Sequence, residues 1–162
     1  MSSIRVEVAG EQAALIERLK ALSEIEARGT LRAIGELLRS STVERFQEER
    51  DPEGTKWAPS IRARESGGKT LTQTARLRTS IAAQSDSQGV AVGTNDIRAA
   101  SLQFGDTRTI RAKNKKYLKF KVGGSWRTVE KVTIHIPARP FLGISAEDEA
   151  EIRATIEEML EE

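Results

Sequence analysis

The chain has 162 residues, which fits a single domain with a moderate hydrophobic core, and we expect residues 1–162 to form that domain. The absence of cysteine excludes disulfides, thiolate metal sites and cysteine nucleophiles, and the net charge of +2 is too small to indicate a polyanionic partner. No apolar run approaches the roughly 20 residues that span a bilayer, and residues 1–12 lack the apolar stretch of a signal peptide, so we expect a soluble protein with no membrane partner.

The first 50 residues are predicted to be mainly helical. Alternating apolar residues at positions 4, 6 and 8 predict a short strand, and apolar residues at helical spacing predict a first helix over residues 15–22. Gly29 and Thr30 interrupt this pattern, and Thr30 is predicted to cap a second helix that ends near Arg50. The second helix has one apolar face, formed by Leu31, Ile34, Leu38 and Phe46.

A polar stretch with glycine and proline follows at residues 51–70. We expect a long mobile loop there, pinned to the core by Trp57. A short helix is predicted over residues 71–81, followed by a strand near residues 90–93 and a second short helix over residues 96–104.

The next part of the chain is predicted to be β-structure. Apolar and charged residues alternate over residues 118–122, and Gly123-Gly124 is a suitable two-residue hairpin turn. Returning strands are predicted over residues 126–129 and 132–136. Residues 106–117 are predicted to form a second mobile loop.

A final helix is predicted over residues 146–160, with Ser145 as its N-cap and carboxylates in its first turn. The order of elements indicates an α+β fold rather than a doubly wound parallel sheet. We expect an N-terminal helical pair packed on a small, mainly antiparallel sheet, with a long hairpin and a C-terminal helix.

Residues able to carry catalysis or bind a metal are few. His135 is the single histidine and has no partner at a suggestive spacing. Gly68-Lys69-Thr70 resembles the end of a phosphate-binding loop, but Ala63 stands where that loop needs glycine. An acidic cluster lacks the spacing of a calcium loop and is interspersed with basic residues; it comprises Glu48, Glu49, Asp51 and Glu53. We expect no enzyme activity, catalytic residue, metal or cofactor.

The strongest charge asymmetry lies in the hairpin region, residues 108–131. Its basic residues are Arg108, Arg111, Lys113, Lys115, Lys116, Lys119, Lys121, Arg127 and Lys131. Aromatic residues are interleaved with them, whereas the final helix is strongly acidic. Three interpretations remain open: a solvated face, a contact with the acidic helix of a neighbouring subunit, or a nucleic-acid-binding module. We take Lys115, Lys116 and Lys119 as candidates for subunit contact and Arg108, Arg111 and Lys113 as candidates to face DNA.

Four segments, in order along the chain, carry a family resemblance. Arg45-Phe46 is followed by the run DPEGTKWAP at residues 51–59, and LTQTARLRTSI follows at residues 71–81. A third segment runs from VGTN at residues 92–95 to QFG at residues 103–105, and the fourth is IPARPFLGIS at residues 136–145. Together they resemble the virion morphogenesis and tail completion family of Mu-like phages and prophages.

The chain departs from the family pattern at three positions. Arg98 stands where the family commonly has tyrosine, Leu102 where it has histidine, and Ala75 where it often has glycine. The resemblance implies a non-enzymatic structural protein of tailed-phage assembly that acts in tail completion or at the head–tail junction as a ring-forming subunit. Its implied partners are copies of itself and other tail or neck proteins, with weak non-specific DNA contact, in the virion and in the host cytoplasm during assembly.

The fourth segment is predicted to be a rigid connector, because its two prolines fix φ and remove backbone donors. Arg139 and Phe141, with Trp57, are predicted to contact another subunit, since aromatic and arginine anchors are typical of interface hot spots. The alternative is that Phe141 and Leu142 close the core beneath the final helix.

Overall fold

The structure is a computed structural model that describes residues 4–7, 24–87 and 89–161. The helices are α2 (Glu24–Glu48), α3 (Ile61–Ser66), α4 (Arg76–Thr79), α5 (Ala99–Phe104) and α6 (Ala146–Glu161). The strands are β1 (Ile4–Glu7), β2 (Ala82–Asp86), β3 (Gly89–Thr94), β4 (Asp106–Arg111), β5 (Leu118–Val122), β6 (Ser125–Val129) and β7 (Lys131–Ile136). The α+β class is therefore confirmed, while the predicted helix over residues 15–22 lies outside the described residues.

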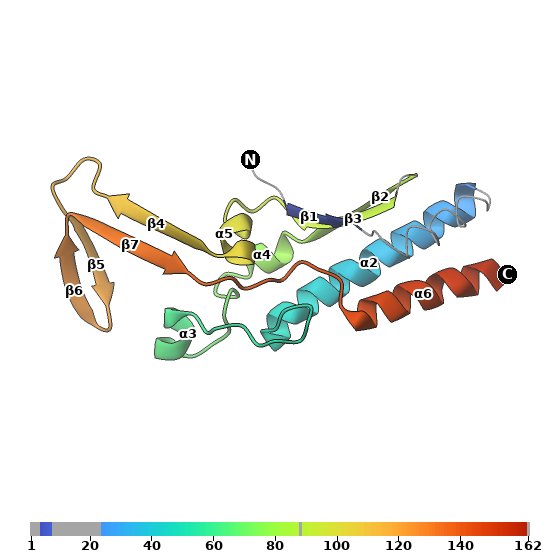
Figure 1. Ribbon diagram of the computed structural model, residues 1–162, viewed down its shortest axis with the longest axis horizontal. Helices are drawn as coiled ribbons and strands as arrows, with labels where there is room; N and C mark the ends of the chain where they lie inside the picture. Colours follow the sequence, from blue (N-terminus) through green and yellow to red (C-terminus); the bar gives the residue numbers. More distant parts are fainter. Residues whose placement is uncertain (1–3, 8–23, 88, 162) are drawn as a thin grey trace.

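The body of the molecule is a small antiparallel sheet covered by the long helix α2, with the second long helix, α6, packed against α2. Its strand order is β1-β3-β2, so β3 lies in the centre. Helix α2 packs against β2 and β3 and also against α6, which runs beside it (Figure 1). Close packing of α2 on the sheet requires a small residue at Gly35, where an added Cβ would lie 3.4 Å from side-chain atoms of Ala83 and Val90.

One hydrophobic core joins these elements. Helix α2 supplies the apolar face predicted from its periodicity, and it meets residues from the sheet, the loops and α6. The buried cluster comprises Leu31, Ile34, Leu38, Phe46, Trp57, Leu77, Ile81, Val90, Val92, Ala99, Phe141, Leu142, Ile152 and Ile156.

The predicted helix start at Thr30 is wrong, because α2 begins at Glu24 and continues through Gly29 and Thr30. Both Ala27 and Thr30 are buried, and they extend the core-facing stripe by one turn ahead of Leu31. Packing of that stripe outweighs the helical penalty of one glycine, which is about 1 kcal/mol.

The predicted helix over residues 71–81 is also too long, since only the four residues of α4 are helical. Leu71 and Ala75 adopt left-handed backbone conformations, with φ of 61° and 53°, which no α-helix accommodates. Strand β2 was not predicted, because it is exposed along most of its length and lacks apolar alternation.

Residues 106–136 form a projecting β-structure that we name the arm. Strands β4 and β7 pair to form what we name the outer ribbon. Strands β5 and β6, which lie between them in the sequence, form the inner hairpin at the end of the arm far from the body (Figure 1). The predicted Gly123-Gly124 hairpin is confirmed, with both glycines at positive φ. Residues 106–111, predicted as part of a loop, instead form β4. The local sequence does not reveal this strand, because its partner β7 lies 20 or more residues further along the chain.

Candidate functional site

Residues 137–145, which we name the joint, connect the arm to α6 and lie against the core. Phe141 is fully buried, and its ring centroid lies 5.3 Å from that of Phe46. Phe46 in turn meets Trp57 edge-on at 5.5 Å. Gly143 leaves room for the turn at residues 51–54, since an added Cβ would lie 2.5 Å from Pro52 Cγ. Phe141 therefore closes the core, as the second interpretation of the joint predicts.

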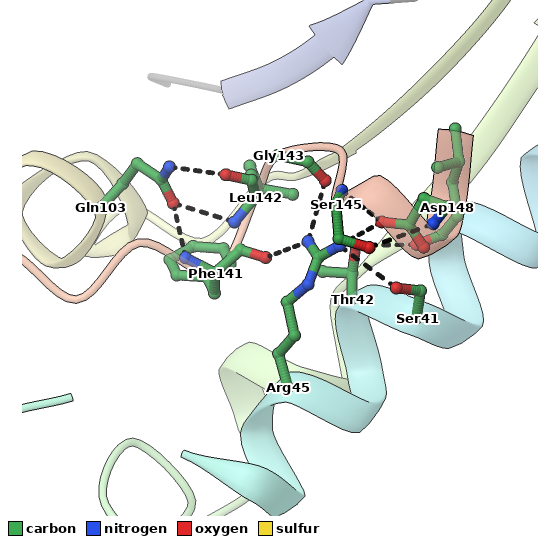
Figure 2. A network of polar contacts seen from close by, with 10 residues as sticks. Ser41, Thr42, Arg45, Gln103, Phe141, Leu142, Gly143, Ser145 and Asp148 are labelled. Atoms are coloured by element: carbon green, nitrogen blue, oxygen red, sulfur yellow. Dashed lines mark hydrogen bonds and ion pairs between the residues drawn. The ribbon is translucent and has the colours of Figure 1, made fainter. Parts of the chain in front are cut away.

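Arg45, in α2, is hydrogen-bonded to the backbone of the joint (Figure 2). Its Nη1 donates to the carbonyl oxygens of Phe141 and Gly143, at 3.1 and 2.8 Å. Its Nη2 forms an ion pair with Asp148 and donates to Ser41 Oγ at 3.2 Å. Burial lowers the pKa of Arg45, and the neighbouring Asp148 carboxylate opposes that shift. One side chain of α2 thus links the joint to α6.

Ser145 and Asp148 form a reciprocal cap at the start of α6. Ser145 Oγ accepts from Asp148 N at 3.1 Å, and Asp148 Oδ2 accepts from Ser145 N at 2.8 Å. This is a capping box with aspartate at its fourth position, and it confirms Ser145 as the N-cap. Asp148 therefore serves both the helix cap and the buried ion pair with Arg45.

Gln103, in α5, is hydrogen-bonded to the backbone of the joint (Figure 2). Its Oε1 accepts from the backbone nitrogens of Phe141 and Leu142, both at 3.0 Å, and its Nε2 donates to Leu142 O at 2.9 Å. The backbone beside it also binds the joint, since Arg139 N donates to Leu102 O at 2.7 Å. Sequence reasoning gave no role to Gln103, and its position in the Gln-Phe-Gly motif was the available signal.

The structure places Trp57, Arg139 and Phe141 in the interior, although we predicted them as subunit contacts. Trp57 Nε1 donates to Pro140 O at 2.8 Å, and Arg139 Nε donates to Ala58 O at 2.6 Å. Burial lowers the pKa of the Arg139 guanidinium. All three side chains are therefore buried within the chain, and their contact with a second subunit stays a prediction.

The predicted basic residues, in contrast, are all exposed and all lie on the arm. They are Arg108, Arg111, Lys113, Lys115, Lys116 and Lys119. Two of the arm's lysines pair with aromatic rings: Lys116 Nζ lies 5.4 Å from the Tyr117 centroid, and Lys119 Nζ lies 5.2 Å from that of Trp126. The structure therefore brings the predicted cations together on one projecting element.

The outer ribbon has two different faces. Directly opposed residues share a face, so Ile110 and Val132 lie together, as do Arg108 and Ile134. The other face is polar, and there Thr107 Oγ1 contacts His135 Nδ1 at 2.7 Å while two further threonines contact each other at 3.0 Å. His135 therefore has a hydroxyl partner on a solvent-facing ribbon.

The loop that resembles a phosphate-binding motif is engaged in local contacts. Thr70 N donates to Glu49 Oε1 at 2.6 Å, which lowers the pKa of that carboxylate, and Lys69 Nζ donates to Gln47 O. Within the described ranges, no group of three or more histidine, cysteine or acidic residues is arranged to hold a metal ion. None of the described helices is both long and apolar enough to cross a membrane.

Helix α6 is acidic, so its charge is opposite to that of the basic arm. Asp148, Ile152 and Ile156 face the core, while its other acidic residues are exposed. These are Glu147, Glu149, Glu151, Glu157, Glu158 and Glu161. The arm and α6 lie at opposite ends of the molecule (Figure 1), so a small net charge conceals a strong separation of charge.

The comparisons with known proteins agree with the family resemblance carried by the four sequence segments. No significant match is found among curated proteins or solved structures. The model of the phage virion morphogenesis family matches residues 9–161, nearly the entire chain. The protein therefore belongs to the phage virion morphogenesis family, and its role lies in virion assembly.

Proposed function

We propose that the protein is a non-enzymatic structural subunit that acts in tail completion or at the head–tail junction. Its copies associate head to tail into a ring, in the host cytoplasm during assembly and then in the virion. Other tail or neck proteins bind that ring. The proposal rests on family membership together with one structural observation, the exposed arm.

The arm exposes several large apolar side chains to solvent. Five large apolar residues of the arm are exposed: Ile110, Tyr117, Val122, Trp126 and Ile134. A two-stranded ribbon is marginally stable on its own, and extensive apolar exposure is typical of a binding surface. The arm therefore suits a protein partner that covers it.

Charge separation favours a head-to-tail arrangement of copies. Two arms repel one another because each is basic, whereas an arm and the acidic face of α6 attract. Such a contact joins two different surfaces, so it propagates from copy to copy and closes into a ring when the rotation permits. A ring fits a position on the tail axis.

The test uses a chain with a shortened arm. Residues 112–130 are replaced by Asn-Gly, which joins Arg111 to Lys131, two residues that already lie opposite one another. In a phage lacking the wild-type gene, the intact chain restores complete particles, and the shortened chain leaves heads or tails unfinished in electron micrographs. Full restoration by the shortened chain would disprove a role for the inner hairpin in assembly.

A second candidate function is nucleic-acid binding by residues 108–131, favoured by the lysine–aromatic pairs. Phosphate contacts would make DNA affinity fall steeply with salt. Replacing Lys113, Lys115 and Lys116 by glutamate would then abolish binding in a gel-shift assay. If neither DNA binding nor infectivity changes in this variant, the candidate is excluded.

A further inference from the structure

We propose that the face of the inner hairpin containing Lys119, Lys121 and Trp126 docks on the outward face of α6 of a second copy. This inference rests on the proposed head-to-tail assembly and names the two surfaces that make the contact.

The register places these three side chains on one face of the hairpin. Lys121 lies directly opposite Trp126, and Lys119 lies two residues from Lys121 on the same strand. Lys119 Nζ is 5.2 Å from the Trp126 ring centroid, and Trp126 is 64% exposed. The face therefore presents one aromatic ring with the Lys119 ammonium group over it and a second lysine at the directly opposed position.

The outward face of α6 has the opposite character. Buried Ile152 and Ile156 define the inward face, and the positions about half a turn away from them are exposed. Ala150 and Ala154 lie near the centre of that outward face, where they leave a flat surface for an aromatic ring. Carboxylates flank them along the helix: Glu147, Glu151, Glu157, Glu158 and Glu161.

The spacing of the charges also matches. Two residues along a strand separate Lys119 from Lys121 by about 6.6 Å, and four residues along a helix separate Glu147 from Glu151 by about 6 Å. Both ammonium groups can therefore meet carboxylates while the ring covers alanine. Within one copy the arm and α6 lie at opposite ends (Figure 1), so the helix must come from a second copy.

Charge reversal on both sides tests the contact. One variant carries Lys119→Glu and Lys121→Glu, and the other carries Glu147→Lys and Glu151→Lys. Each variant alone should self-associate about 10-fold or more weakly than wild type by sedimentation velocity. An equal mixture should assemble again, because each reversed surface then meets its complement. Arg127→Glu is the matched control, since Arg127 lies on the other face of the hairpin and should leave association unchanged.

Photo-cross-linking locates the contact directly. Trp126→p-benzoylphenylalanine should give a dimer-sized product on irradiation, with the link mapped by mass spectrometry to α6. Links to another part of the chain, or to DNA when DNA is added, would overturn this docking.

The two experiments also separate this inference from the proposed function. If wild type assembles while both reversed variants assemble equally well, this docking is wrong and the proposed ring stands. If wild type neither assembles nor cross-links at its highest soluble concentration, the docking and the head-to-tail ring both fail.

Discussion

Arg45 illustrates how a single side chain fixes the relation of three segments. Its guanidinium joins α2 to the joint and to Asp148 at the start of α6, and both charged side chains are nearly excluded from water. A buried ion pair adds little net stability by itself, because removing both charges from water costs several kcal/mol. Loss of one partner is different, because the remaining buried charge is left without compensation.

Arg45→Met should therefore lower the free energy of unfolding by about 3–5 kcal/mol in chemical denaturation. Arg39→Met is the matched control in the same helix, because Arg39 pairs with Glu36 at the surface and its side chain is 37% exposed. The control should change stability by less than about 1 kcal/mol. Equal effects of the two substitutions would show that the buried network contributes nothing of its own.

Ala75 has a backbone conformation that suits glycine. Its φ of 53° and ψ of 2° lie in the left-handed region, where a Cβ is unfavourable. Ala75→Gly should raise the free energy of unfolding by about 0.5–1 kcal/mol. Ala63→Gly, within α3, should instead lower it by about 0.5–1 kcal/mol. A loss of stability in Ala75→Gly would contradict this account of the turn.

Arg98 forms an ion pair with Asp96 at the protein surface. Its guanidinium hydrogen bonds lower the pKa of Asp96 to about 2 from 3.8, and the backbone nitrogen of Arg98 also donates to that carboxylate. Because the folded-state pKa is the lower one, this contribution is present above about pH 4 and is lost as pH falls towards 2. Asp96→Asn should flatten the stability curve in that window; an unchanged pH dependence would refute the assignment.

The arm and the body differ as elements in what holds them together. Strand β3 has neighbours on both sides and contributes buried Val90 and Val92, whereas the outer ribbon has two strands and both faces open. In dilute solution, the arm's amides should exchange hydrogen about 10-fold or more faster than those of β3. Assembly should slow exchange in the inner hairpin. Equal protection of the arm and β3 in a monomer would contradict this difference.

Local sequence signals predicted the elements that depend on nearby residues. Gly123-Gly124 predicted the inner hairpin, and the Ser145 cap predicted the start of α6. Features that depend on distant partners were missed. Strand β4 pairs with a strand beyond the inner hairpin, and Thr30 is held within α2 by packing against the core. The same reason hid the ion pair of Arg45, whose partner Asp148 is 103 residues away.

The residues predicted as subunit contacts fall into an exposed group and a buried group. Charge pattern alone located the arm's basic residues, since solvated cations need no distant partner to be recognised. Trp57 and Arg139 have the chemistry of interface anchors, but their donors bind the carbonyl oxygens of Pro140 and Ala58. Sequence does not distinguish a buried anchor from an exposed one when the acceptor is a backbone carbonyl.

At the scale of the whole molecule, the two ends carry opposite charge. The basic arm projects at one end, and α6 presents its carboxylates at the other (Figure 1). The core and the buried network of Arg45 hold the joint, and therefore the root of the arm, in place relative to α6. This arrangement supports the proposed head-to-tail contact between copies, and the strength of that contact should fall as salt screens the charges.

The central claim is that the arm of one copy binds the next. Light scattering of the intact chain and of the chain with residues 112–130 replaced by Asn-Gly, across one concentration series at low salt, tests it most directly. The account predicts that the mean mass of the intact chain rises with concentration towards a closed oligomer, while the shortened chain remains a monomer with an unchanged circular dichroism spectrum of its helices. Identical mass curves for the two chains would contradict it.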